Sequence, residues 1–85
     1  MTVLNRPVHP DHARAREWRE RMGLSRVELA RRTGYSHSMI QNFELGFYRA
    51  NGKPISDRTM HTYRMACAAV AAGYQFDWGD VTVTL

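Results

Sequence analysis

Apolar residues near the N-terminus recur at the spacing of a helix. Ala15 and Trp18 fall on one face when the chain turns by about 100° per residue, so they predict a helix over 12–22 with one buried side. Gly23 marks its end, because glycine tolerates the left-handed backbone that closes many helices. Asp11 precedes this helix and is expected to cap its first amide groups.

Two shorter helices follow, each with its own start signal. Ser25 and Glu28 have the spacing of a capping box, in which Ser25 accepts the Glu28 amide and the Glu28 side chain reaches back to the Ser25 amide. Gly34 ends this helix, and Ser36 is placed to cap the next one. The sequence therefore predicts, over 25–46, two helices joined by a tight turn that contains glycine.

The segment 47–55 carries a turn signal and is followed by a longer helix. Asn51-Gly52 favours a tight reversal, so this segment either doubles back as a small wing or forms an ordinary loop. A helix is predicted over 56–72, because apolar residues recur there at intervals of three and four: Met60, Tyr63, Cys67 and Val70.

The last residues of the chain have a different periodicity. Val81, Val83 and Leu85 alternate with threonines, which is strand spacing, and Gly73 and Gly79 precede them. A single strand needs a neighbour for its amides and carbonyls, so we expect a short β-strand that pairs with the same segment of a second copy. The expected contacts of this homodimer in the tail 74–85 are Phe76, Trp78, Val81, Val83 and Leu85. Dimerisation through the fourth helix alone is the alternative.

The distribution of charge adds information that the apolar pattern lacks. The chain has 85 residues, 12 Lys and Arg, 8 Asp and Glu, and a formal net charge of +4, which fits one small domain spanning the whole chain. Every Lys and Arg lies between Arg6 and Arg64, whereas Asp77 and Asp80 are the charged residues of 65–85. A basic body suits a polyanion such as double-stranded DNA, and an acidic end suits a separate role.

Other classes of protein find no support in the sequence. Cys67 is the single cysteine, and no long apolar run or leader marks a membrane or secreted protein, so we expect a cytoplasmic location. His9 and His12 are spaced like metal ligands but lack a further ligand pair. Phosphate-binding glycine loops, paired carboxylates and activated nucleophiles are missing. We therefore expect no enzyme activity, no metal or cofactor, no membrane association and no small-molecule effector.

The predicted turn and its flanking helices form a helix-turn-helix pattern. Ala30 is small where two helices must cross closely, Gly34 supplies the turn, and Ile40 supplies an apolar anchor in the second helix. With these residues the chain over 15–46 closely resembles the Cro/C1 repressor family of phages and mobile elements, and 56–72 resembles it less tightly. The resemblance implies an all-α domain of four or five helices that binds DNA.

The resemblance also implies roles for individual residues. His37 and Ser38 correspond to positions that meet base edges in the major groove, and Asn42 corresponds to the next such position, one turn further on. Asn can pair with adenine through two hydrogen bonds, while His and Ser can donate or accept. Plain solvation is the alternative for a polar helix face. The expected DNA contacts are Arg26, Tyr35, Ser36, His37, Ser38, Gln41, Asn42, Tyr48, Arg49 and Lys53.

Some residues depart from the family pattern. Arg26 stands where the family usually has a Gln that bonds phosphate, and Arg serves phosphate at least as well. Thr33 replaces a larger apolar residue, and Tyr35 is bulkier than usual, so its hydroxyl is expected to reach the DNA backbone. Arg19 and Glu44 match a pair that forms a partly buried ion pair between the first and third helices.

Together these features predict a sequence-specific transcription regulator, a repressor or autorepressor that binds an inverted-repeat operator as a homodimer. A dimer of this kind sets its recognition helices about 34 Å apart, one turn of the duplex. The alternative function is an antitoxin-like or anti-activator module, which would use the same fold to hold a protein partner at the acidic, aromatic tail.

Overall fold

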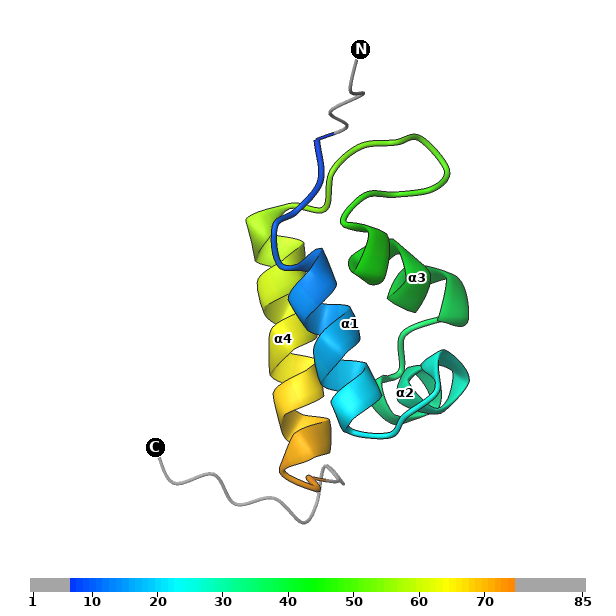
Figure 1. The fold of residues 1–85 in the computed structure, drawn as a ribbon, viewed down its shortest axis with the longest axis vertical. Helices are drawn as coiled ribbons and strands as arrows, with labels where there is room; N and C mark the ends of the chain where they lie inside the picture. Colours follow the sequence, from blue (N-terminus) through cyan, green and yellow to red (C-terminus); the bar gives the residue numbers. More distant parts are fainter. Residues whose placement is uncertain (1–6, 75–85) are drawn as a thin grey trace.

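The structure is a computed structural model that describes residues 7–74. Four helices occupy this part of the chain: α1 (His12–Arg21), α2 (Arg26–Thr33), α3 (His37–Leu45) and α4 (Asp57–Ala71). Helices α1 and α4 run side by side in the same direction, while α3 packs against α1 and α2, and α2 also contacts α4 (Figure 1). The predicted all-α fold of four or five helices is thus confirmed, with four helices in the described residues.

The expected strand and the dimer contacts lie outside the described residues. They comprise Phe76, Trp78, Val81, Val83 and Leu85, and they stay predictions.

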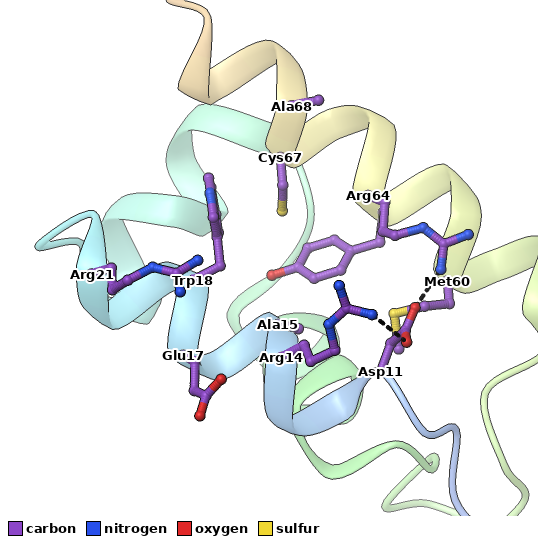
Figure 2. Close-up of a pocket in the computed structure, with 11 residues that line it drawn as sticks. Asp11, Arg14, Ala15, Glu17, Trp18, Arg21, Met60, Arg64, Cys67 and Ala68 are labelled. Carbon is purple, nitrogen blue, oxygen red and sulfur yellow. Dashed lines mark hydrogen bonds and ion pairs between the residues drawn. The ribbon is translucent and has the colours of Figure 1, made fainter.

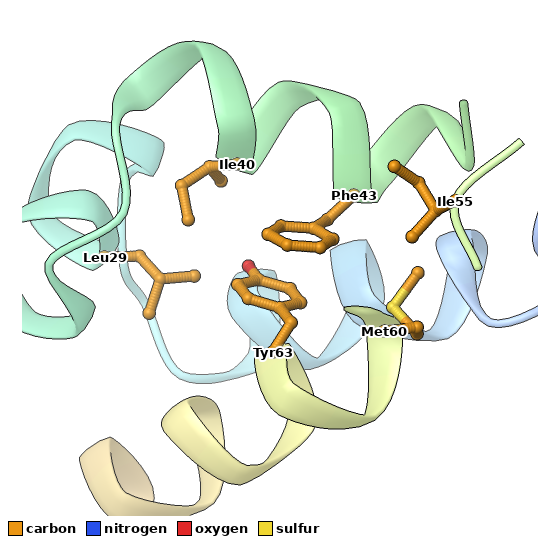
Figure 3. Close-up of a cluster of buried hydrophobic side chains, with 6 residues drawn as sticks. All are labelled: Leu29, Ile40, Phe43, Ile55, Met60 and Tyr63. Carbon is orange, nitrogen blue, oxygen red and sulfur yellow. The ribbon is translucent and has the colours of Figure 1, made fainter. Parts of the chain in front are cut away.

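The hydrophobic core lies where α2, α3 and α4 meet. Phe43 and Tyr63 stack with ring centroids 3.9 Å apart, and Tyr35 meets both rings edge-on. Burying aromatic side chains removes a large apolar area from water, and edge-on pairs add a further favourable term. The fully buried apolar side chains, drawn in Figure 3, are Leu29, Ile40, Phe43, Ile55, Met60 and Tyr63.

Local capping chemistry fixes where the helices begin and end. The hydroxyls of Ser25, Ser36 and Ser56 each accept the amide three residues further on, which satisfies one of the free amides at a helix start. Gly34 and Gly46 close α2 and α3 with φ of 84° and 82°, a backbone that other residues rarely adopt. Both α2 and α3 lie within the segment 25–46 for which the sequence predicts two helices and a tight turn.

Two expected caps are wrong, for the same physical reason. Asp11 has a helical backbone and makes no side-chain cap bond, because its carboxylate pairs with Arg64 of α4 instead. Glu28 does not reach back to Ser25, because its carboxylate bonds Arg31 and Arg32 on the following turn. In both cases a nearby guanidinium is a stronger partner for a carboxylate than a backbone amide.

No helix within residues 7–74 is both long enough and apolar enough to cross a lipid bilayer.

Candidate nucleic-acid interface

The N-terminal end of α3 presents polar side chains to solvent. Ser36 caps this helix through a 3.1 Å bond from the Met39 amide to its hydroxyl, which fixes the direction in which the helix leaves the turn. His37 and Ser38 occupy the first two helical positions and are exposed. They project from the end of the helix where backbone amides point outward and the helix dipole is positive. This end can therefore approach a polyanion and contact base edges at the same time.

Thr33 closes the turn that leads into α3, although the sequence predicted no hydrogen bond for its side chain. The Thr33 hydroxyl donates to the Leu29 carbonyl and accepts the Tyr35 amide, so the apolar residue usual at this position is replaced by two hydrogen bonds. The Tyr35 ring turns inward against Phe43 and Tyr63, and burial raises the pKa of its hydroxyl. The expected contact between the Tyr35 hydroxyl and the DNA backbone stays a prediction.

The middle of α3 is joined to the following loop by Arg49. The Arg49 guanidinium donates to the Gln41 side-chain oxygen at 2.7 Å, and the Arg49 amide donates to the Asn42 side-chain oxygen at 3.1 Å. Asn42 and Gln41 are half-buried, unlike His37 and Ser38. The Asn42 side-chain nitrogen donates to the Met39 sulfur at 3.7 Å, so Asn42 keeps one acceptor position and one N–H for a base. The structure therefore links the expected base contact at Asn42 to the position of the loop.

The segment 47–55 doubles back on itself, as the wing alternative predicted. Phe47 and Pro54 form an isolated antiparallel bridge, and the Tyr48 amide donates to the Lys53 carbonyl at 2.8 Å. The Asn51 side chain accepts the Lys53 amide, and Gly52 has the positive φ of 72° that the turn needs. The loop is thus shaped by its own hydrogen bonds and holds its cationic side chains outward.

Not every expected contact on this loop is equally exposed. Arg49 and Lys53 are exposed, as contact with phosphate requires. Tyr48 is half-buried and packs against the core, so its ring serves the fold as well as any contact with DNA.

A buried ion-pair network ties α1, α2 and α3 together. Arg19 donates to both carboxylate oxygens of Glu44, at 2.6 and 3.0 Å, and to the Leu24 carbonyl at 2.9 Å. The Arg19 and Glu44 side chains are only 9% and 3% exposed, and the bond to Glu44 raises the pKa of Arg19. The expected pair between the first and third helices is confirmed. Such a network holds α3 in one orientation relative to α1.

Arg26, expected to contact phosphate, also belongs to this network. Its Nε donates to Glu44 at 3.1 Å, which the sequence pattern did not indicate. The side chain remains 36% exposed, and its two terminal nitrogens make no hydrogen bond to the described residues. Arg26 can therefore hold Glu44 with one nitrogen and meet a phosphate with the others.

A small pocket of about 190 Å³ brings three arginines together beside α3. Arg26 comes from α2, Arg49 from the loop and Arg16 from α1, with Gln41, Glu44 and Leu45 completing the lining. Guanidinium groups converging from separate elements suit the bidentate recognition of phosphate oxygens. Arg16 was missed by sequence reasoning. The signal was its position one turn before Arg19, since residues three apart share a helix face and Arg19 faces α3.

The histidines near the N-terminus have a structural role. The His9 ring is buried, accepting the Asp11 amide at Nδ1 and bonding Asp57 through Nε2 at 2.7 Å. An accepting Nδ1 places the ring proton on Nε2, so the neutral tautomer donates to Asp57. The His9 amide donates to the Gly46 carbonyl, which pins this segment to the end of α3. Residues 7–74 contain no group of three or more potential side-chain ligands placed to hold a metal ion.

The exposed start of α3, the folded-back loop and the arginine pocket lie on one helix-turn-helix unit. A family described as helix-turn-helix domain matches residues 13–77, which is most of the chain, and this protein belongs to that family. The finding supports a DNA-binding regulator. No curated protein and no solved structure matches the chain.

Proposed function

We propose that the protein is a sequence-specific transcription regulator of the Cro/C1 type, a repressor or autorepressor that places α3 in the major groove of double-stranded DNA. The observation that carries the proposal is the arginine pocket formed by Arg16, Arg26 and Arg49 beside the exposed start of α3. A phosphate held in this pocket fixes the register and the orientation of α3 on the duplex. The base-reading side chains then reach the base edges.

The contacts divide into two groups by chemistry. Arg16, Arg26, Arg49 and Lys53 bind phosphate, which supplies affinity for any sequence and makes binding sensitive to salt. His37, Ser38 and Asn42 read bases, with Ser36 and Gln41 beside them and Tyr35 and Tyr48 meeting the sugar-phosphate backbone. The buried Arg19 network keeps the two groups at a fixed spacing, because it joins α1, α2 and the end of α3.

The proposed operator follows from symmetry. The chain acts as one domain, and its tail 74–85 joins two copies about a two-fold axis. Two copies related in this way read two half-sites about 34 Å apart, so the operator is a pseudo-palindrome. A repressor that blocks its own promoter acts in the cytoplasm on the chromosome or on a phage or mobile element.

The test is selection of bound fragments from a random DNA library, followed by titration of the selected site at several salt concentrations. Arg49→Ala should weaken binding to all sequences alike and reduce the salt slope by about one counterion. Arg21→Ala is the matched control, since it removes the same charge from the side of α1 that faces α4. If no fragment is enriched, the proposal fails and the protein-binding alternative is favoured.

A further inference from the structure

A groove of about 600 Å³ runs between α1 and α4, where the two helices lie side by side without close backbone packing. Trp18 from α1 and Cys67 from α4 lie on its two sides (Figure 2). The apolar part of the lining consists of Ala15, Trp18, Met60, Tyr63, Cys67 and Ala68. Grooves lined in this way take apolar and aromatic groups that exclude water.

The groove faces away from the proposed DNA contacts. Arg14 lines the groove, whereas Arg16 lines the arginine pocket beside α3. Residues two apart on a helix point about 200° apart, so the two sites lie on opposite sides of α1. A group bound in the groove can therefore remain there while α3 meets DNA.

The inner wall of the groove holds a polar atom whose hydrogen bonding is incomplete. The Tyr63 hydroxyl is buried and has no hydrogen-bond partner among the described residues. Its neighbour Cys67 offers a thiol, which is a weak partner, and burial raises the pKa of that thiol to about 11. The Tyr63 hydroxyl lies beneath the surface of the groove, so the ring of Tyr63 adds to the apolar part of the lining.

The rim of the groove is basic. Arg14, Arg21 and Arg64 line it against Asp11 and Glu17, which leaves one net positive charge. Within residues 7–74, Arg21 makes no ion pair, and Arg14 has only a long 3.9 Å contact with Asp11. The rim is therefore suited to carboxylates that accompany an apolar group.

We propose that residues 75–80 of the same chain dock in this groove, with Phe76 and Trp78 on its apolar lining and Asp77 and Asp80 at its basic rim. This segment has two aromatic rings, two carboxylates and no cation, which matches both the lining and the rim. In this proposal Phe76 and Trp78 cover their own domain in place of the dimer contact expected for them, and Val81, Val83 and Leu85 are left to pair with another copy.

The position and length of the segment suit this docking. Helix α4 ends at Ala71, only three residues beyond Ala68 of the groove, and the Tyr74 amide still bonds the Ala69 carbonyl. Six extended residues span about 20 Å. The groove along α4 from Ala68 to Met60 is about 12 Å long, so the segment can cover it.

Cys67 provides the readout, since it is the single cysteine of the chain and lines the groove. A water-soluble disulfide reagent should react slowly with Cys67 in the full-length protein. Phe76→Ser with Trp78→Ser, made in the full-length chain, should raise the rate about tenfold. This factor is expected if the groove of the wild-type protein is open about a tenth of the time. The wild-type rate should not change on dilution, because docking within one chain is independent of concentration.

The matched control is Thr82→Ser with Thr84→Ser, which also changes two residues of the tail but outside the docked segment, and should leave the rate unchanged. Circular dichroism on all variants confirms that the helices are intact, so that a fast rate is not caused by unfolding. An equal rate in wild type and in the Phe76/Trp78 variant overturns the proposal. A wild-type rate that rises on dilution also overturns it, because the groove would then be filled by a second copy. DNA binding enters none of these measurements, so they stand apart from the proposed function.

Discussion

The two ends of α3 are built in opposite ways. At its N-terminal end the helix leaves an open turn: Gly34 has free space around it, and Ser36 and His37 are exposed. At its C-terminal end Glu44 is buried in an ion-pair network, and the Gly46 carbonyl accepts amides from two other segments. The helix is thus fixed at one end and presented at the other.

The difference shows how a small domain can expose a binding helix without losing its orientation. At the fixed end Arg19 and Glu44 satisfy each other's polar groups internally, so they add to specificity of structure, and only Arg26 of this network keeps nitrogens for a ligand. The presented end carries only local bonds within the helix and turn, so its side chains remain free to contact a partner. Substitutions at the two ends should therefore separate stability from binding.

The largest effect is expected at the fixed end. Glu44→Leu leaves the buried Arg19 guanidinium with the Leu24 carbonyl alone, and should lower the free energy of unfolding by about 3–5 kcal/mol. Adding Arg19→Met should recover part of the loss in chemical denaturation. Asp11→Asn, which breaks the more exposed pair with Arg64, should cost less than about 1 kcal/mol. A double variant as unstable as Glu44→Leu would contradict the network.

The two glycines that end α2 and α3 provide a matched pair. A Cβ at Gly46 would lie 2.9 Å from the His9 backbone nitrogen, whereas a Cβ at Gly34 would meet nothing within 4 Å, although both have nearly the same φ. Gly34→Ala should cost about 1–2 kcal/mol from backbone strain, and Gly46→Ala about 2–5 kcal/mol because overpacking adds to that strain. Thermal unfolding compares the two variants directly. Equal losses of stability would show that Gly46 is not closely packed at the C-terminal end of α3.

At the presented end, His37→Ala should act on binding alone. We expect a loss of about 1–3 kcal/mol on the selected operator and relaxed preference at one base of each half-site, with the salt slope unchanged. The free energy of unfolding should change by less than about 0.5 kcal/mol, since His37 is exposed. Binding titrations on the selected site and its single-base variants decide the matter, and an unaltered base preference would show that His37 reads no base.

Two serine caps test whether the start of α3 has a role beyond folding. Ser36 and Ser56 make the same cap with the same 3.1 Å bond, so replacing either with Ala should lower stability by about 1 kcal/mol. Only Ser36→Ala should also weaken operator binding, because Ser56 caps α4. Equal operator affinity for the two variants, measured where both are folded, would argue against a contact at Ser36.

The smallest effect is expected at Glu28, whose exposed pairs lie at the start of α2. Hydrogen bonds from Arg31 and Arg32 lower the pKa of Glu28 from 4.5 to about 2. A carboxyl group whose pKa is lower in the folded than in the unfolded state stabilises the fold at pH values above its unfolded pKa. This stabilisation is lost as the pH falls through the folded pKa. Wild type should be slightly more stable than Glu28→Gln at neutral pH, and the two stabilities should converge between about pH 4.5 and 2. A constant difference across this range would show that the pairs contribute nothing.

The helices were predictable because their signals are local. Ser25, Ser36, Gly34 and Gly46 each act on backbone groups within a few residues, so the sequence alone placed the helix-turn-helix unit. The pairing of Arg19 with Glu44 was predictable only through the family resemblance, since the two residues lie 25 positions apart in the sequence.

The remaining features depend on tertiary packing. Arg16 enters the arginine pocket because α1 crosses near the end of α3, and Arg26 meets Glu44 because α2 does so too. The sequence showed His9 only as one of two histidines spaced like metal ligands without a further ligand pair, yet its ring and backbone join α3 to α4. Spacing along a chain shows which residues share a helix face, but it does not show which faces meet.

The bond between Asn42 and the Arg49 amide also bears on how new operator preferences could arise. If Asn42 contacts a base as proposed, its substitution changes that contact and at the same time removes a bond to the loop that carries Arg49 and Lys53. A substitution at His37 or Ser38 would change only the proposed base contact, because neither side chain is bonded to another element within residues 7–74. In a library selected for altered operators, we therefore expect the first accepted changes at His37 and Ser38, and changes at Asn42 only later.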